Sequence, residues 1–494
     1  MKLTVDNRTG LLNDYYFQTL CLIYFPGEKF PTGDVCSQRH ADVVMEASGS
    51  GFFCRVTLSE GDRSACGEFL SDGYRFSVPL SRDDEAQITA GRAFLQAGER
   101  LLGFCPPWGC ITGLRPAKRA RFFLSRGNGE DAVRRLFTDD YLVSAEKAQL
   151  TMLTAAAENL LLSSVSFGDC AMYISVPFCP TRCEYCSFIS YASRKLFALI
   201  PDYLEKLTAD IKQTAALISS LGLRLRAVYI GGGTPSILDE KQTERLLGAV
   251  SESIGGTGVT EFTYESGRPD TTTVEKLKIA KANGVNRISI NPQSTSDFVL
   301  KEIGRNHTAA QFFSAAGAAF DVGFDCINAD LIAGLPGDDG ESFAKSLEDV
   351  IELGFQNITV HTLSIKNASA IRFSRSGIYD PEGVFARECV SHSFGRLLGS
   401  GYGPYYFYRQ KNIIGNAENT GYSLNGKEGI YNVLMMEEAS SVFACGAGAI
   451  TKLVSPDGSV IKRMAHPKYP FEYLSSDDTV GAEAVRKFYG GHFE

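Results

Sequence analysis

The sequence predicts an α/β protein: a partial, open barrel of six β/α units, preceded by an N-terminal α+β domain and followed by a C-terminal extension that caps the barrel. Three observations predict this fold. From residue 171 onward, strand and helix patterns alternate, as in parallel strands joined by right-handed crossovers. Six units suit an open barrel better than a closed one of eight. Polar and glycine-rich motifs follow the strands, where barrels build their sites.

Residues 1–165 carry the pattern expected of the N-terminal domain. Apolar runs separated by Gly and Asp clusters predict strands, and the periodicity later becomes helical. The predicted strands are 17–25, 42–45 and 52–57, and the predicted helices are 85–102 and two within 128–165.

The segment from Pro107 to Lys118 contains the only tryptophan of the chain, Trp108. Its cations Arg115 and Lys118 are suited to a substrate rich in carboxylates. The alternative interpretation, which we favour, is a turn and a helix start that pack Trp108 against the barrel.

The predicted barrel occupies residues 166–375, and the extension occupies 376–494. The extension begins with a predicted helix at 384–399 and continues as a stretch rich in Gly, Tyr and Asn. Within the barrel we expect strands at 172–176, 227–231, 261–266, 287–291, 325–333 and 357–364, and helices at 201–220, 239–253, 273–283, 308–321 and 340–353.

Three cysteines at C-x3-C-x2-C spacing, Cys179, Cys183 and Cys186, follow the first barrel strand. Three thiolates on one loop can hold three irons of a cubane cluster, whereas a ferredoxin supplies four per cluster. The fourth iron would be open to the amine and carboxylate of S-adenosylmethionine (SAM). The alternative is a structural zinc knuckle with a distant fourth ligand. The absence of a nearby His or fourth Cys at zinc-finger spacing, and the position between a strand and a helix, favour the cluster.

The loop and its flanks, Tyr173-Ile-Ser-Val-Pro-Phe-Cys179 and Tyr185-Cys-Ser-Phe188, resemble the signature of the radical SAM superfamily. Within it they resemble the oxygen-independent coproporphyrinogen III oxidase/dehydrogenase group, which has HemN, HemW and HemZ types. The resemblance is to the HemZ type, spans nearly the whole chain and is strongest over 171–365. It implies a radical SAM partial barrel with a [4Fe–4S] cluster and SAM, whose reductive cleavage gives a 5′-deoxyadenosyl radical.

The motifs at the strand ends match the SAM-binding positions of this family. Tyr229-Ile-Gly-Gly-Gly-Thr-Pro-Ser236 resembles a motif that binds the SAM amine, and its glycines permit close approach of the backbone. Carboxylates, an amide and a guanidinium at later strand ends match residues that contact the ammonium and ribose of SAM. The resemblance therefore implies a cluster on Cys179, Cys183 and Cys186 and a SAM site of Tyr173, Tyr185, Gly232, Gly233, Thr234, Glu265, Gln293, Arg305 and Asp330.

For several polar residues near the predicted site, the sequence allows both a functional and a structural role. Arg268 and Asp270 either take part in the site or form the turn and cap of the next helix. His361 and Lys366 end the sixth strand and are suited to substrate, although a lone His in a strand is more often structural.

An aromatic and cationic stretch, Tyr405-Tyr-Phe-Tyr-Arg-Gln-Lys-Asn412, resembles the HemZ-type pattern. Arg409 and Lys411 are suited to propionate carboxylates, and the tyrosines to the walls around a flat macrocycle. The alternative is a surface loop.

By analogy, the expected reaction removes hydrogen from the β-carbon of a coproporphyrinogen III propionate. Loss of carbon dioxide and of an electron then leaves a vinyl group, and two rounds give protoporphyrinogen IX. Ser175 departs from the HemN type, which has His at that position. A HemW-like haem-binding or haem-delivery protein and a radical SAM enzyme for another small molecule are the alternatives. The expected electron donor is a flavodoxin or ferredoxin.

Bulk properties exclude several other classes of protein. The net charge of −8 and the pI of about 5.5 argue against a nucleic-acid partner. No apolar run approaches the roughly 18 residues of a membrane span. The N-terminus lacks the apolar core of a secretion signal, and we therefore expect a cytoplasmic location. The 13 cysteines, an odd number, favour free thiols and a metal site over a disulfide framework.

Overall fold

The computed structural model describes residues 1–31, 37–186, 190–364, 383–410 and 413–493. The chain forms two units, one of Met1–Ala156 with Tyr408–Asn412, and one of Ala157–Phe407 with Ile413–Glu494. No helix within the described ranges combines the length and the apolar character that crossing a membrane requires.

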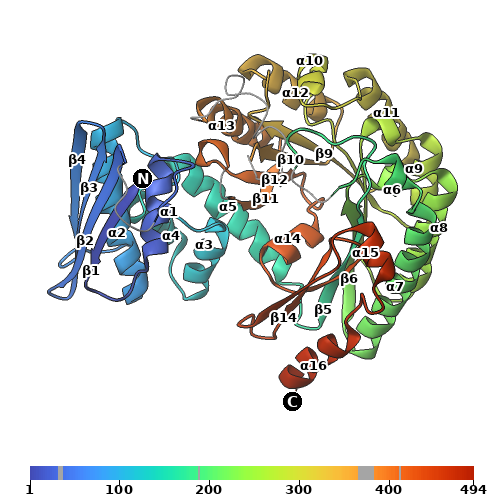
Figure 1. Ribbon diagram of the computed structural model, residues 1–494, viewed down its shortest axis with the longest axis horizontal. Helices are drawn as coiled ribbons and strands as arrows, with labels where there is room; N and C mark the ends of the chain where they lie inside the picture. The colour runs from blue at the N-terminus through green and yellow to red at the C-terminus, as the bar shows by residue number, and fades with distance from the viewer. Residues whose placement is uncertain (32–36, 187–189, 365–382, 411–412, 494) are drawn as a thin grey trace. The chain divides into compact units, whose positions relative to one another are not determined.

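The first unit is built on a four-stranded sheet in the order β1-β2-β3-β4 (Figure 1). Strand β1 pairs in parallel with β2, and the remaining pairs are antiparallel. The strands are β1 (Lys2–Asn7), β2 (Arg39–Ser48), β3 (Gly51–Glu60) and β4 (Arg63–Leu70). The helices of this part of the chain are α1 (Asp14–Tyr24), α2 (Arg82–Leu102), α3 (Pro116–Ser125), α4 (Glu130–Arg135) and α5 (Ala145–Leu162).

The strand predicted at 17–25 is wrong, because this segment is helix α1. Its apolar residues recur at helical spacing and are buried on one face: Phe17, Leu20, Cys21 and Tyr24. Asn13 caps the helix, since its side chain accepts a hydrogen bond from the Tyr16 amide at 3.0 Å. The strands predicted at 42–45 and 52–57 and the helix predicted at 85–102 are confirmed, whereas β1 and β4 were not predicted.

The second unit contains an eleven-stranded sheet in the order β11-β12-β10-β9-β8-β7-β6-β5-β13-β14-β15. Strands β5 to β10 pair in parallel and in sequence order, which confirms the six predicted barrel strands. Their bounds are β5 (Asp169–Val176), β6 (Arg224–Gly232), β7 (Glu261–Gly267), β8 (Arg287–Ile290), β9 (Cys326–Ala333) and β10 (Asn357–Thr362).

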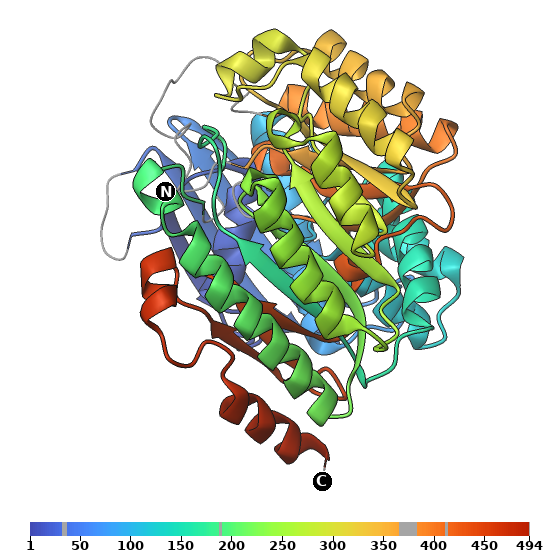
Figure 2. The ribbon, with the colours of Figure 1, turned by 90° about the vertical axis from the view of Figure 1, so that its right-hand side faces the viewer.

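Helices that follow these strands form a row along one face of the parallel sheet (Figures 1 and 2). This arrangement leaves the ends of the strands for polar residues, as in other β/α barrels. The helices are α6 (Arg194–Phe197), α7 (Ile200–Ser220), α8 (Glu240–Ile254), α9 (Val274–Ala282), α10 (Asp297–Glu302), α11 (Ala309–Val322) and α12 (Gly340–Glu352).

The C-terminal region adds strands to both edges of the same sheet. At one edge β12 (Asn419–Ser423) pairs antiparallel with β10, and β11 (Gly403–Tyr408) lies beyond it. At the other edge β13 (Ser441–Cys445) pairs in parallel with β5. The remaining elements are α13 (Val384–Gly399), α14 (Ile430–Met436), β14 (Ile450–Val454), β15 (Ile461–Ala465), α15 (Pro470–Ser475) and α16 (Ala482–Phe493).

Helix α14 lies at the amino-terminal end of β7. The Glu261 carboxylate, at the first residue of that strand, accepts from the amides of Ile430 at 2.7 Å and Tyr431 at 3.2 Å. A carboxylate at a helix N-terminus satisfies amides that have no intrahelical partner. This part of the C-terminal region therefore packs at the strand ends opposite to those that carry the predicted site.

Candidate active site

The loop with three cysteines leaves the carboxyl end of β5 and is anchored by backbone hydrogen bonds. The Cys179 amide donates to the Tyr191 carbonyl at 3.1 Å, and the Glu184 amide donates to the Ile303 carbonyl at 3.2 Å. The Cys186 amide turns back to the Cys183 carbonyl at 3.1 Å. Cys179 and Cys183 are buried and Cys186 is half-buried, so the loop presents its thiols in a shielded position.

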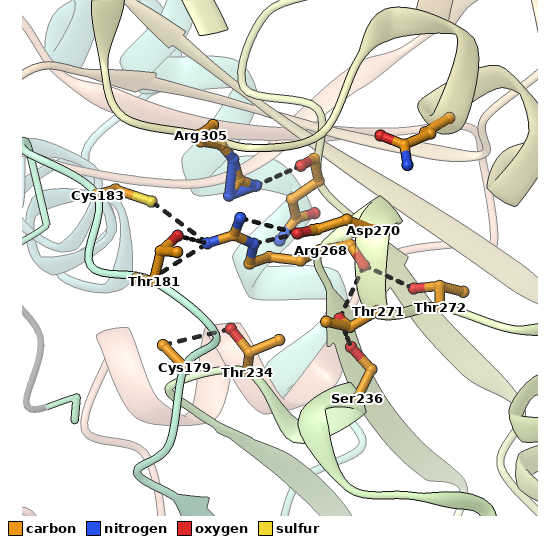
Figure 3. Close-up of polar contacts among 12 residues, drawn as sticks. Cys179, Thr181, Cys183, Thr234, Ser236, Arg268, Asp270, Thr271, Thr272 and Arg305 are labelled. Carbon is orange, nitrogen blue, oxygen red and sulfur yellow. Dashed lines mark hydrogen bonds and ion pairs between the residues drawn. The ribbon is translucent and has the colours of Figure 1, made fainter. Parts of the chain in front are cut away.

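The glycine turn after β6 is joined directly to this loop. Gly233 donates to the Val176 carbonyl and Thr234 to the Phe178 carbonyl, both at 2.8 Å. The Thr234 hydroxyl also lies 3.3 Å from Cys179 Sγ (Figure 3). A Cβ at position 233 would lie 2.6 Å from the Phe178 carbonyl oxygen, so this close approach requires glycine.

Glu265 on β7 and Asp330 on β9 provide two carboxylates with different protonation behaviour. Burial, together with the charge of Asp330, raises the pKa of Glu265 to about 8. Burial opposes ionisation of Asp330 too, but the neighbouring His361 and the hydrogen bond from Asn328 outweigh it and hold the pKa of Asp330 below its usual value.

The surroundings of these carboxylates explain this difference. The Tyr229 hydroxyl is 3.4 Å from Glu265 Oε2, a distant donor. Asn328 Nδ2 donates to Asp330 Oδ1 at 2.8 Å, and His361 Nε2 lies 3.8 Å from Asp330 Oδ2. His361 therefore has a neighbour at the predicted site, while Lys366 lies outside the described residues.

Gln293 and Arg305 are buried, and each carries a polar atom without a hydrogen-bond partner among the described residues. Gln293 has a backbone φ of 67° and donates its amide to the Asp330 carbonyl at 2.9 Å, while its Oε1 has no partner. Arg305 Nη2 donates to the Asn291 carbonyl at 2.6 Å, while its Nε has none. Such orphaned groups are rare in buried positions and are suited to a polar ligand.

The two predicted tyrosines have different surroundings. Tyr173 stacks on Tyr229, with ring centroids 6.2 Å apart, and on Tyr431 at 6.4 Å. Tyr185 packs on an apolar cluster, and burial raises the pKa of its hydroxyl despite the nearby Arg305 cation. The members of this apolar side-chain cluster are Val299, Leu300, Ile303, Ile332, Leu335, Leu363, Ala386 and Ile414.

The contacts of Arg268 and Ser175 add detail that the sequence left open. Arg268 extends from the end of β7 to the cysteine loop, where its Nη1 donates to Thr181 Oγ1 at 2.8 Å. Ser175 is buried and its hydroxyl donates to the Ala447 carbonyl at 2.9 Å.

Arg409 belongs to the first unit, where it contacts a backbone carbonyl and an aromatic ring. Its Nη1 donates to the Ile111 carbonyl at 2.6 Å, and its guanidinium lies 5.3 Å from the centre of the Trp108 ring. Trp108 is fully buried. Lys411 lies outside the described residues.

The residues fit the expected cofactors. Three thiols on one loop suit an iron–sulfur cluster more than a catalytic zinc ion. Among the described residues no three Cys, His, Asp or Glu side chains are gathered as metal ligands. The orphaned Gln293 and Arg305 atoms and the nearby Glu265 carboxylate suit the polar groups of SAM.

The chain is similar to several known proteins. The family model of the radical SAM superfamily matches residues 173–350. The oxygen-independent coproporphyrinogen-III oxidase-like protein HemZ of Bacillus subtilis is 35% identical over 443 residues, 85% of this chain and 87% of that protein. The haem chaperone HemW of the same organism is 33% identical over 195 residues, 39% of this chain and 50% of that protein. Among solved structures, coproporphyrinogen III oxidase HemN from Escherichia coli has a TM-score of 0.48 at 23% identity and covers 59% of this chain and 67% of its own.

The chain therefore belongs to the radical SAM superfamily, whose enzymes use a [4Fe–4S] cluster and SAM. Within that superfamily it falls in the group of coproporphyrinogen oxidase-like proteins that includes HemZ, and it is a radical SAM oxidoreductase.

Proposed function

We propose that this protein carries out the oxygen-independent oxidative decarboxylation of coproporphyrinogen III propionates to vinyl groups, giving protoporphyrinogen IX in porphyrin and haem biosynthesis. One observation carries the proposal. The cysteine loop, the glycine turn and the groups matched to SAM lie at adjacent strand ends, in a chain that is 35% identical to HemZ over 85% of its length.

In this reaction the cysteine loop and the glycine turn provide the cluster site. Cys179, Cys183 and Cys186 hold the cluster, and the glycine turn fixes their loop through Thr234. When bound and reduced by one electron, the cluster and SAM supply the hydrogen abstraction that begins the reaction.

The remaining polar groups of the site orient SAM. Glu265 accepts hydrogen bonds from its amine, and Asp330, held ionised beside His361, accepts from its ribose. Gln293 and Arg305 complete the shell with the atoms that lack partners among the described residues.

The chemistry of each decarboxylation determines which electron donors and acceptors are needed. A propionate becomes a vinyl group by giving one hydrogen atom to the 5′-deoxyadenosyl radical and one electron to an external one-electron acceptor, with loss of carbon dioxide. One electron also has to reach the cluster before each hydrogen abstraction, and we propose a flavodoxin or ferredoxin of the cytoplasm as its source.

A HemW-like function in haem binding or delivery is the second candidate. It is favoured by the 33% identity to HemW over 39% of this chain. It is also favoured by Ser175, which stands where the HemN type has His and whose hydroxyl is engaged by the Ala447 carbonyl.

Anaerobic product analysis separates these functions. The reconstituted protein is incubated with coproporphyrinogen III, SAM and a reductant, and porphyrins and 5′-deoxyadenosine are quantified. Vinyl products that accumulate over several turnovers support the proposal. Stoichiometric haem binding without vinyl products supports the carrier, and 5′-deoxyadenosine that forms without any change in the porphyrinogen indicates another substrate.

A further inference from the structure

A buried arginine that the sequence did not assign to the cofactors contacts the cysteine loop. Arg268, only 3% exposed, donates from Nη1 to Thr181 Oγ1 at 2.8 Å and to the Thr181 carbonyl at 3.3 Å. The same nitrogen lies 4.0 Å from Cys183 Sγ (Figure 3). Arg268 thus connects the end of β7 to two positions of the loop.

The backbone around Arg268 holds the side chain in this direction. Gly267 has a φ of 77°, and the register of β7 against β8 shifts between Glu265 and Gly267. The Arg268 carbonyl then accepts from the hydroxyls of Thr271 at 3.1 Å and Thr272 at 2.9 Å. A residue with so many fixed contacts loses little freedom when it binds another group.

Asp270 accompanies Arg268 as a bidentate partner. Arg268 Nε and Nη2 each donate to one carboxylate oxygen of Asp270 at 3.0 Å. This fork geometry leaves Nη1 directed at the cysteine loop. The pair therefore places one positive and one negative charge at defined positions, with the positive one nearer to the Cys183 sulfur.

The other titratable neighbours do not cancel this arrangement. Burial and the charges of Arg305 and Arg268 lower the pKa of His307 to about 3, so His307 is neutral at pH 7. Arg305 adds a second buried cation near the thiols of Cys183 and Cys179. Two buried guanidinium groups therefore lie near the loop thiols, and Asp270 is paired with one of them.

We propose that Arg268 and Asp270 form a positioning pair that holds the cysteine loop and sets the reduction potential of the cluster bound there. This inference rests on the proposed placement of the cluster on Cys179, Cys183 and Cys186. Charges and hydrogen bonds near cysteine sulfurs set the potential of iron–sulfur clusters. Reduction adds one electron, so the Arg268 cation stabilises the reduced form and the Asp270 carboxylate destabilises it.

Opposite charge changes at the two positions test the proposal. The reconstituted full-length variants Arg268→Gln and Asp270→Asn are titrated anaerobically, and the reduced cluster is followed by electron paramagnetic resonance. Arg268→Gln is expected to make the equilibrium constant for reduction about tenfold less favourable, and Asp270→Asn about tenfold more favourable. Shifts of the same sign, or no shift in either variant, would overturn the proposal.

Two further variants keep the test decisive. Arg268→Lys retains the charge but not the fork, so the potential should stay near that of the unaltered protein. Amide hydrogen exchange around Thr181, measured before reconstitution, should be faster in this variant, and unchanged exchange would contradict the positioning role. Arg224→Gln breaks another bidentate pair, in which Nη2 lies 2.8 Å from Asp169 Oδ2 at the amino end of β5, and should leave the potential unaltered.

These outcomes are independent of the substrate. Iron content and the cluster signal are measured in each sample before titration, so failure to bind a cluster is seen separately from an unchanged potential. The porphyrinogen is absent from the titration, so a different substrate would leave the result unaffected.

Discussion

The Thr234 hydroxyl donates to the Cys179 sulfur at 3.3 Å, which joins the turn after β6 to the loop after β5. Burial raises the pKa of the Cys179 thiol, and the hydrogen bond from Thr234 partly offsets that effect. The contact shows that the first cysteine of the loop is positioned by the same turn that the sequence assigns to SAM.

Replacing any one of Cys179, Cys183 or Cys186 with Ala should abolish the broad iron–sulfur absorbance and the cleavage of SAM. Each substitution removes one of three thiolates from the same cluster. Absorbance spectra and 5′-deoxyadenosine assays after anaerobic reconstitution measure both effects. Cys66→Ala, at a partly exposed thiol of β4, is the matched control and should retain both properties. Full cluster content in one of the three loop variants would show that the thiols are wrongly assigned.

Gly233→Ala should destabilise the protein and reduce cluster binding. The new methyl group would stand 2.6 Å from the Phe178 carbonyl oxygen, so the cysteine loop has to move, at a cost of about 1–3 kcal/mol in the free energy of unfolding. Gly317→Ala makes the same chemical change within helix α11, where nothing lies within 4 Å of the added atom. That variant should gain about 0.5–1 kcal/mol. Chemical denaturation compares the two, and equal effects would show that the turn does not require glycine.

Gln293→Gly should stabilise the folded protein and at the same time weaken SAM binding. The backbone φ of 67° at Gln293 favours glycine, so the free energy of unfolding should rise by about 1 kcal/mol. Loss of the side-chain amide should nevertheless weaken SAM binding by about tenfold. Calorimetry and denaturation measure the two effects. Gln311→Gly, which removes a capping residue of α11, should lower stability and leave SAM binding unchanged.

Ionisation of Glu265 should make the stability of the protein without cofactors decrease as pH rises. Its pKa is raised from 4.5 to about 8 in the folded state, so the folded protein holds the proton more tightly than the unfolded chain. Stability therefore falls between about pH 4.5 and pH 8, by up to about 1.4 kcal/mol per pH unit. Glu265→Gln removes this dependence. Urea denaturation of both proteins at several pH values should give curves that diverge in this range, and parallel curves would contradict the assignment.

The parallel part of the fold could be predicted because its signals are local. Each barrel strand is a short apolar run, and each following helix has its own periodicity and caps, as Asp239 and Thr308 illustrate. The strands of the C-terminal region were not predicted because their pairing depends on distant partners. Strand β13, for example, pairs with β5, which lies far earlier in the chain.

Helix α1 shows a signal that was present but was misread. The spacing of Phe17, Leu20 and Tyr24 and the cap at Asn13 both indicate a helix, whereas the run of apolar and aromatic residues suggested a strand.

At the site, the sequence indicates which residue types follow which strand, but it does not give the direction of long side chains. Arg268 appeared equally suited to a turn, and only the bulge at Gly267 and the fork to Asp270 direct it to the cysteine loop. Arg409 shows the converse, because a cation that seemed available for propionates is held by the Ile111 carbonyl.

The central claim is that three thiolates hold an iron–sulfur cluster with an iron left for SAM. The most direct measurement is the amount of iron, sulfide and zinc in the anaerobically reconstituted protein, together with the 5′-deoxyadenosine formed from SAM on reduction. We predict about four irons and four sulfides per chain and reductant-dependent 5′-deoxyadenosine. A protein that retains zinc, binds no cluster and leaves SAM intact would contradict the account.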